Sequence, residues 1–348
     1  MEIKNQVPSR PRKKITAWQW AFLALLVGCT VWILSTDHKQ AKPQESRGKI
    51  FGTYYTMKYE YTEPLDSLIL VELLKVDHSL SMFNQNSTIA RVNRNETDLS
   101  DSLLSEVFTL AQEVSVQTSG AFDVTVAPLV NAWGFGFQNA DSVSSSKIDS
   151  IMQFVGYEKV CLSNGHFVKQ DERIMMDFSA IAKGYGVDRV ARLFDSLDIT
   201  DYMVEIGGEV VVKGKNPKGK AWTIEITRPT ENEVVSDQNK ILLSVSDIAM
   251  ATSGNYRRFY IKDGKRYAHT IDSHSGYPVE HSLLSATVLA DDCATADAFA
   301  TSFMVMGTEA TKAFLAAHAE MPVYLIYSGE QGGLQIWCSP AMEKYIQL

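Results

Sequence analysis

Cysteine is scarce in this sequence, and its four copies lie far apart. They form no CxxC pair, which gives no indication of a zinc site or a disulfide framework; they are Cys29, Cys161, Cys293 and Cys338. Clustered Lys and Arg residues are missing outside the N-terminus, and the formal net charge is −8. That balance argues against a nucleic-acid-binding surface, so no nucleic acid is expected as a partner.

The rest of the composition is that of an ordinary globular protein. The 348 residues are 45% hydrophobic and 21% charged, which is enough to bury a core in one large domain or two smaller ones. Strand-like stretches with short connections are interrupted by groups of helices, and short connections favour antiparallel pairing. The sequence therefore predicts an α+β body, a mixed and largely antiparallel sheet with packed helices.

Only one long apolar run is present, and it lies near the N-terminus. Residues 15–34 are apolar at all but four positions. Basic residues come directly before the run: Arg10, Arg12, Lys13 and Lys14. A basic flank before such a run is typical of an export signal or a membrane anchor whose basic end stays in the cytoplasm.

Two interpretations of this run stay open. The letters LVGC, residues 26–29, resemble a bacterial lipobox, which would make Cys29 the lipidated first residue of a mature lipoprotein. The letters TVWIL continue the run to about the 20 residues that span a bilayer, which slightly favours an uncleaved anchor. Both interpretations predict a body tethered at the bacterial inner membrane, on its periplasmic or extracytoplasmic side.

The sequence predicts three parts in order along the chain. Residues 1–35 form the basic stub with the anchor or signal, the polar residues 36–49 form a linker, and residues 50–348 form one catalytic domain. In the helix expected near 65–83, the apolar period predicts an inward face. The residues assigned to that face are Leu68, Val71, Leu74 and Val76.

Small and polar residues are concentrated at two turns. In DFSAIAKGYGVD, residues 177–188, Asp177 ends an apolar strand and Lys183 lies in a small-residue turn before a helix. Small side chains let a phosphate approach the backbone N–H groups at a helix start, although an ordinary turn with an exposed lysine explains these letters equally well. The pair Gly207–Gly208 lies between two strands and indicates a hairpin turn more often than a ligand contact.

Two further stretches carry side chains suited to chemistry. In TADAFATSFMVMG, residues 295–307, Asp297 and Thr301 are four positions apart and share one helical face. They are either a pair of hard oxygen ligands or part of a capped helix start. In RYAHTIDSHSGYPV, His269 is suited to act as a base near neutral pH, although a lone histidine in a strand is more often structural.

Seven stretches, taken in order, resemble the ApbE family, the bacterial FAD:protein FMN transferases. The resemblance extends from about Gly52 to the C-terminus. The stretches are GTYYTMKY, SMFNQNSTIARVN, TSGAFDVTVAPLVNAWGFG, DFSAIAKGYGVD, EIGGEVVVKGKNPKGKAWTIEI, ATSGNYRRFYIKDGKRYAHTIDSHSGYPV and ATADAFATSFMVMG.

The resemblance implies a reaction and a metal. Enzymes of this family cleave the pyrophosphate of FAD and attach FMN, by a phosphoester, to a Thr or Ser hydroxyl of an acceptor protein, with release of AMP. They require Mg²⁺, which prefers oxygen ligands and shares them with substrate phosphates. The implied metal ligands are Asp297 and Thr301, with Ala180 and Ala300 contributing through their backbones.

The resemblance also assigns contacts to FAD and a base. The implied FAD contacts are Met57, Ala121, Phe122, Asp123, Asp177, Lys183 and Ile271. His269 corresponds to the family histidine suggested to take the proton from the acceptor hydroxyl. One departure concerns the family turn D-P-x-T-G, which here has Ser273 in place of the proline. This replacement should loosen the turn and leaves the roles of His274 and Ser275 open.

Three functions are consistent with these residues. The first is the FMN transferase, acting on another protein, which we expect to be a membrane redox subunit facing the same compartment. The second is a Mg²⁺-dependent FAD pyrophosphatase, in which water is the acceptor. The third is a membrane-tethered flavin-binding protein without turnover, which would need neither the metal ligands nor the base. The sequence ranks them in that order.

Overall fold

The chain divides into a short N-terminal unit and a large body. A computed structural model of the protein describes residues 16–35, 41–135, 143–227, 240–255, 259–262, 265–268, 270–329 and 333–347. The N-terminal unit is Met1–Ala41, and the body is Lys42–Leu348.

The described residues of the N-terminal unit include the helix α1 (Ala17–Ser35), which coincides with most of the apolar run. Apolar side chains in residues 17–30 of this helix are exposed, among them Trp18, Phe22 and Leu25. Within the described parts of the chain, no helix combines the length and the apolar character that crossing a membrane requires.

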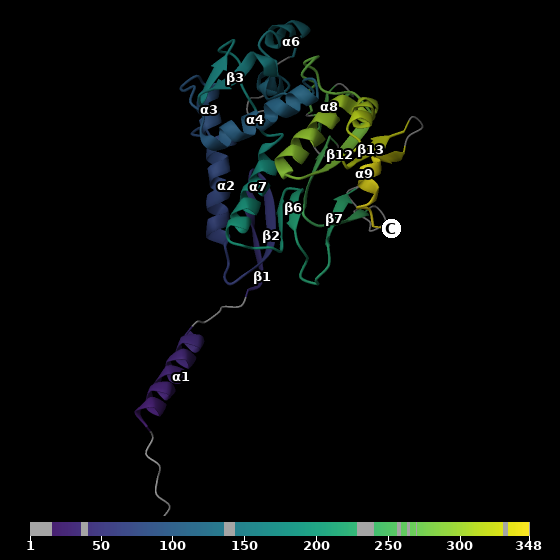
Figure 1. Cartoon of the computed structure of the whole chain (residues 1–348). Coiled ribbons are helices and arrows are strands. Elements are labelled where there is room, and N and C mark those ends of the chain that lie inside the picture. The colour runs from purple at the N-terminus through teal and green to yellow at the C-terminus, as the bar shows by residue number, and fades with distance from the viewer. Residues whose placement is uncertain are drawn as a thin grey trace, which may run out of the picture. The chain divides into compact units, whose positions relative to one another are not determined.

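An eight-stranded antiparallel sheet forms the centre of the body (Figure 1). Its order is β1-β2-β5-β6-β9-β12-β13-β14. The strands are β1 (Lys42–Ile50), β2 (Thr53–Tyr61), β5 (Tyr202–Ile206), β6 (Glu209–Lys213), β9 (Ile248–Gly254), β12 (Leu283–Ala290), β13 (Val323–Ser328) and β14 (Leu334–Cys338). Three two-stranded ribbons accompany the sheet: β3 (Val160–Ser163) with β4 (His166–Lys169), β7 (Trp222–Thr227) with β8 (Lys240–Val245), and β10 (Phe259–Lys262) with β11 (Lys265–Ala268).

Helices are interspersed among the strands, which confirms the predicted α+β body with a largely antiparallel sheet. The longer helices are α2 (Asp66–Leu80), α4 (Ser102–Gln117), α7 (Ala182–Ser196) and α8 (Cys293–Ala317). The shorter ones are α3 (Thr88–Asn93), α5 (Ala127–Ala132), α6 (Ser145–Met152) and α9 (Pro340–Glu343), with 3₁₀ turns η1 (Val124–Val126) and η2 (Tyr157–Lys159). Gly307 interrupts α8 with a φ of 76°, so α8 consists of two helical segments that meet at a kink.

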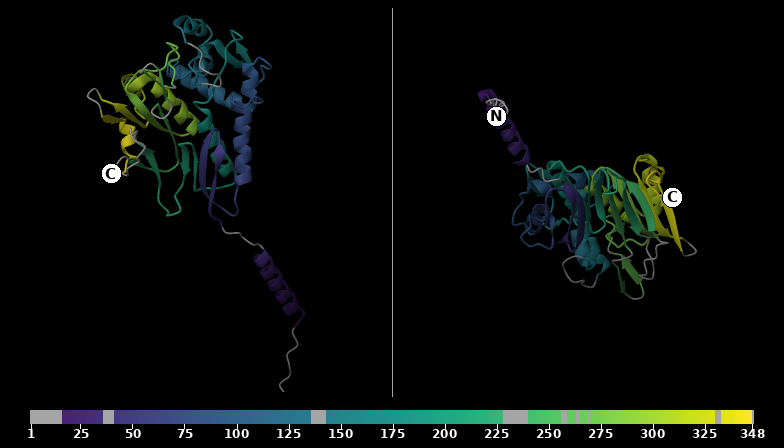
Figure 2. Two further views of the ribbon diagram at one scale, coloured as in Figure 1. Left: turned by 180° about the vertical axis from the view of Figure 1, so that it is seen from behind. Right: turned by 90° about the horizontal axis from the view of Figure 1, so that it is seen from below.

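The two faces of the sheet are covered by different elements. On one face α2 and α7 pack on β2 and β5, and α8 packs on β9 and β12. On the other face, the β7–β8 ribbon and α9 enclose a second layer of apolar side chains. Neighbouring strand residues alternate between the faces as the strand period requires: Ala249 faces the helices and Met250 the ribbon. Figure 2 shows the body from behind and from below.

The predicted linker is shorter than expected, because residues 42–49 belong to β1. This strand pairs with all of β2, from Lys42 opposite Tyr61 to Ile50 opposite Thr53. Its side chains are mostly polar and exposed, and Ser46 is the one buried residue of the strand. An edge strand has one open side and often carries charge, so its polar composition resembles that of a linker.

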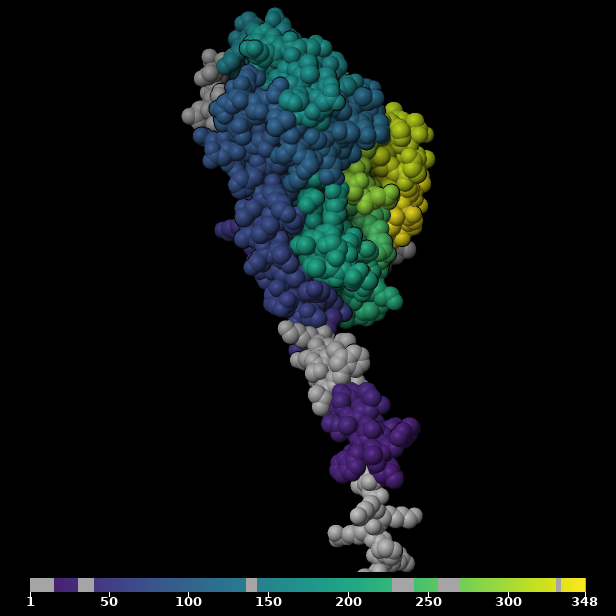
Figure 3. Space-filling model, turned by 60° about the vertical axis from the view of Figure 1, so that its left-hand side comes forward, coloured from purple at the N-terminus to yellow at the C-terminus, as the bar shows by residue number. Residues whose placement is uncertain are grey.

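The inward face predicted for the helix near 65–83 was mostly wrong. The buried apolar residues of α2 are Ile69, Leu73, Val76 and Leu80. Leu68, Val71 and Leu74 are exposed instead, on the outer side of a helix that Figure 3 shows in blue at the surface. Apolar residues surround much of this helix, so the period alone did not distinguish its two sides.

Candidate functional site

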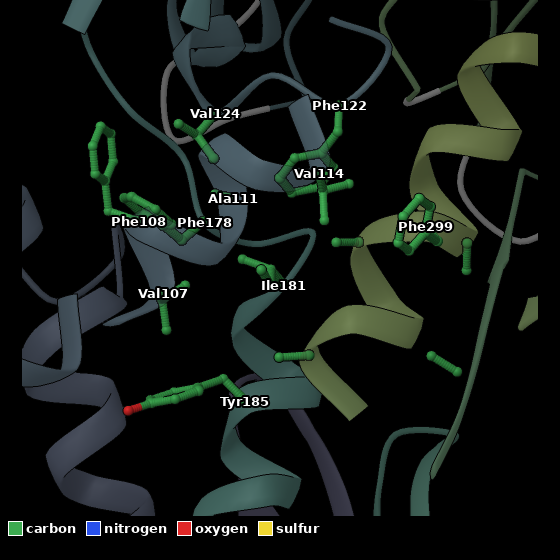
Figure 4. Packing of buried hydrophobic residues seen from close by; sticks show 14 of the residues in the cluster. Val107, Phe108, Ala111, Val114, Phe122, Val124, Phe178, Ile181, Tyr185 and Phe299 are labelled. Carbon is green, nitrogen blue, oxygen red and sulfur yellow. The ribbon is translucent and has the colours of Figure 1, made fainter. Parts of the chain in front are cut away.

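The largest apolar cluster anchors the segment that leads into α7. Phe178, Ile181 and Tyr185 point into this cluster, opposite Phe299 of α8 (Figure 4). Asp177 donates its backbone N–H to the carbonyl oxygen of Val124 at 2.7 Å. These anchors hold the small-residue turn in place and leave Ala180 and Lys183 only partly buried.

The first two turns of α7 are bonded to the start of α8. The Asp188 carboxylate accepts the backbone N–H groups of Cys293 and Ala294, each at 2.8 Å. Gly184 lies against α8 so closely that a Cβ there would overlap the carbonyl oxygen of Cys293. The Gly184 N–H donates to Asp297 Oδ2 at 3.1 Å, which brings the start of α7 directly beside the Asp297 carboxylate.

One lysine and two carboxylates meet at this junction. Lys183 Nζ lies 2.6 Å from Glu209 Oε1 and 3.7 Å from Asp297 Oδ2. The side chains of Glu209 and Asp297 are only 3% and 2% exposed, and this burial raises the pKa of both carboxyl groups, to about 7 for Glu209. Burial opposes the charge of Lys183 as well, but Asp297 and Glu209 outweigh it and raise its pKa, so the lysine stays protonated.

Hydroxyl groups extend this polar cluster along α8. Thr301 lies one helical turn after Asp297, as the sequence predicts, and its Oγ1 is 3.1 Å from Ser253 Oγ at the end of β9. Ala300 is fully buried within α8. The expectation that Ala180 and Ala300 offer backbone oxygens to a metal stays a prediction.

The donor set suits Mg²⁺. Asp297, Thr301 and Ser253 offer only oxygen, which is the ligand type that Mg²⁺ prefers. Glu209 Oε2 is buried and has no hydrogen-bond partner in the part of the chain that the structure describes. In the same part, no three His, Cys, Asp or Glu side chains are grouped to hold a metal, so hydroxyl or backbone oxygens would have to complete the site.

The loop before η1 and the turn after residue 270 are bonded to each other. Ser273 Oγ donates to the carbonyl oxygen of Gly120 at 2.5 Å, and His274 Nε2 lies 2.9 Å from the carbonyl oxygen of Ser119. These contacts bring Ala121 and Ile271, two of the expected FAD contacts, into neighbouring segments.

Most of the expected FAD contacts on these segments are buried. Ala121 and Phe122 are 7% and 3% exposed, and Ile271 packs in a small cluster with Leu129 and Trp133. Asp123 accepts hydrogen bonds from the N–H and hydroxyl of Thr125, each at 2.7 Å, and from the N–H of Tyr157 at 2.9 Å. These bonds indicate that the Asp123 carboxylate orders its own loop.

Asp177 turns its carboxylate back onto the turn that follows it. Its Oδ1 accepts the Ser179 N–H at 2.8 Å, and burial raises the pKa of the Asp177 carboxyl group. The side chain is half-buried. Asp177 thus remains at the edge of the site, six residues before Lys183.

Two further expected site residues are Met57 on β2 and His269. Met57 is fully buried between the sheet and α2, in a cluster with Ile69 and Leu73. This packing encloses the side chain, and a contact of Met57 with FAD stays a prediction. His269, the expected base, lies outside the described residues.

The sequence analysis missed Glu209 and Ser253. Glu209 directly follows the Gly207–Gly208 turn, where both glycines have positive φ, and that pair was interpreted as indicating a hairpin turn more often than a ligand contact. A carboxylate placed directly after a tight turn between two strands was the available signal. Ser253 carried no signal, because its role depends on the pairing of β9 with β12 beside α8.

Comparisons with known proteins match most of this chain. The model of the ApbE family matches residues 51–325. The chain is 34% identical to the FAD:protein FMN transferase of Vibrio cholerae, over 90% of this chain and 93% of that protein. It is 35% identical to the FAD:protein FMN transferase of Haemophilus influenzae, over 86% of this chain and 90% of that protein.

Solved structures are similar over the same region. The flavin transferase ApbE from Vibrio cholerae superposes with a TM-score of 0.79 at 33% identity, covering 88% of this chain and 99% of that one. The flavinyl transferase ApbE from Pseudomonas stutzeri, in its apo form, superposes with a TM-score of 0.80 at 28% identity, covering 89% and 98%.

Proposed function

Because this chain belongs to the ApbE family, we propose that it is a transferase that moves FMN from FAD onto an acceptor protein. The observation that carries the proposal is the junction of α7 and α8, where Lys183 lies between Glu209 and Asp297 and a hydroxyl follows one turn later. A cation and oxygen ligands at two helix starts suit a pyrophosphate bond that must be bound and polarised.

Asp297 and Thr301 would hold Mg²⁺ at this junction. When bound, the metal neutralises charge on the pyrophosphate and helps to orient it for in-line displacement. Lys183 supplies a fixed positive charge to the phosphates. The buried Asp188 and Gly184 contacts keep the two helix starts together.

In the proposed transfer, a phosphoester bond to the acceptor forms and the pyrophosphate bond of FAD breaks. The hydroxyl oxygen of an acceptor Thr or Ser attacks the phosphorus of the FMN half, and the bond from that phosphorus to the bridging oxygen breaks. AMP leaves with that oxygen. We assign the removal of the hydroxyl proton to His269, on the ground of its motif alone.

We further propose that the body acts outside the cytoplasm, held by the N-terminal segment at the inner membrane. The basic flank and the apolar residues 15–34 support this proposal, as do the exposed apolar side chains of α1. Anchoring and lipidation of Cys29 both remain open. The acceptor would then be a membrane redox subunit that faces the same compartment.

The proposal is tested with the full chain in detergent, FAD, Mg²⁺ and an acceptor domain that carries a Thr in the family's target context. The acceptor should gain the mass of one FMN unit while AMP is released. Asp297→Ala should abolish the gain, because it removes the buried carboxylate, whereas Asp291→Ala, on an exposed residue nearby, should leave it intact. Free FMN and AMP without acceptor labelling would indicate a pyrophosphatase, and FAD binding without cleavage a flavin carrier.

A further inference from the structure

Glu209 is the buried charge at the site that the proposed reaction does not yet use. It is the first residue of β6, directly after the Gly207–Gly208 turn, and it is 3% exposed. One carboxylate oxygen pairs with Lys183, and the other has no hydrogen-bond partner in the described residues. A buried carboxylate that is only half satisfied is costly and calls for a role.

Lys183 is shared unequally between two carboxylates. Its Nζ is 2.6 Å from Glu209 Oε1, a hydrogen-bonded ion pair, but 3.7 Å from Asp297 Oδ2. Asp297 Oδ2 instead accepts the backbone N–H of Gly184 at 3.1 Å. The ammonium group is therefore held on the Glu209 side of the cluster.

Removing Glu209 would change how Lys183 is shared between the two carboxylates. Among the described residues, Asp297 is then the carboxylate left beside Lys183. The buried ammonium group would be drawn to it, because an unpaired charge in a low-dielectric site is strongly attracted to an opposite one. A closed Lys183–Asp297 ion pair would neutralise the carboxylate and place the ammonium group where a divalent cation would bind.

We propose that Glu209 is a positioning residue that holds Lys183 away from Asp297 and so keeps the Asp297 carboxylate available to a divalent cation. The inference rests on the proposed function, since it assumes that Asp297 is a metal ligand. It assigns to Glu209 a part in metal affinity rather than direct contact with FAD.

The test measures binding of Mn²⁺ alone to the full chain in detergent, from the loss of the free-ion electron paramagnetic resonance signal, with Mg²⁺ as competitor. Glu209→Gln keeps the shape of the side chain and should weaken Mn²⁺ binding about tenfold or more, the range found when residues around metal ligands are changed. Glu72→Gln is the matched control. It removes another carboxylate that pairs with a cation of α7, Arg189, at 2.6 Å, and it should leave Mn²⁺ affinity unchanged.

A second variant separates positioning from direct ligation. In Glu209→Gln with Lys183→Met no ammonium group remains to close on Asp297, so Mn²⁺ affinity should return to the wild-type range. If the double variant binds as weakly as Glu209→Gln, or if Glu209→Gln binds like the wild type, the inference is overturned. Should Glu209→Gln not fold, Lys183→Met alone must bind Mn²⁺ at least as tightly as the wild type, and weaker binding would overturn the inference.

The same experiment distinguishes failure of the inference from failure of the proposed function. A wild-type chain that binds no Mn²⁺ and labels no acceptor overturns both. A wild-type chain that binds Mn²⁺ and labels the acceptor, with Glu209→Gln unaffected in metal binding, overturns only the role of Glu209.

Discussion

Asp188 shows how a single buried residue couples the helix junction to pH. Burial raises the pKa of the Asp188 carboxyl group to about 7. The two N–H bonds from Cys293 and Ala294 favour the charged form and lower the pKa, but burial has the larger effect. Because the folded-state pKa lies above that of the unfolded chain, the folded protein binds the extra proton. The stability that protonated Asp188 contributes is fully present below about pH 4 and is lost as the pH rises to about 7.

Replacing Asp188 by Asn tests this coupling. The amide can accept through only one atom, so we expect the loss of one N–H bond to cost about 1–2 kcal/mol of unfolding free energy. The free energy of unfolding, from urea titrations at pH 5 and pH 8, should fall with pH more steeply in the wild type than in Asp188→Asn. Equal slopes in the two proteins would contradict the assignment.

At the scale of elements, the close approach of α7 and α8 depends on one glycine. Gly184→Ala would push a methyl group into the Cys293 carbonyl oxygen, and relief of that overlap should cost roughly 1–3 kcal/mol. Separation of the helices would also move Lys183 away from Asp297, so FMN transfer should fall along with the denaturation midpoint. Gly28→Ala in α1, where a Cβ meets nothing within 4 Å, serves as the control and should alter neither quantity.

At the scale of the whole molecule, the boundary of the folded body can be tested by truncation. A chain that begins at Lys42 keeps β1 and all of the second unit, so we expect its melting temperature and its transferase activity in solution to match those of the full chain. A chain that begins at Ile50 loses β1 and the Ser46 hydroxyl that lies 3.0 Å from the Tyr59 hydroxyl. Its melting temperature should be lower by roughly 5 °C or more, and calorimetry of the two chains decides the boundary.

Strong local signals explain which elements could be predicted from the sequence. Helix α4 begins after Asp101, which accepts the Leu104 N–H as an N-cap, and it ends just before Gly120 with a φ of 87°. Such caps act within a few residues of sequence. The polar edge strand β1 and the orientation of α2 depend instead on partners distant in sequence, which is why the predicted linker was too long and the inward face of α2 was wrong.

The residues of the candidate site also differ in whether a single segment of sequence predicts them. Asp297 and Thr301 were predictable because one helix sets their spacing, and Lys183 because its turn has a recognisable composition. The approach of Lys183 to Asp297 depends on the contacts of Asp188 and Gly184 with α8. These contacts cannot be inferred from either segment alone. A contact of Met57 with FAD stays a prediction, because alternation along β2 says which side chains share a face but not which face a ligand reaches.

The bond between Gly184 and Asp297 has a consequence for the order of folding. Its two ends are 113 positions apart in the chain, so the junction requires closure of a long loop, and contacts of that kind form late. A chain that emerges from the ribosome carries Lys183 and Glu209 long before Asp297 is made. Until then the junction of α7 and α8 cannot form, so the proposed capacity to handle a dinucleotide arises only after Asp297 has been made.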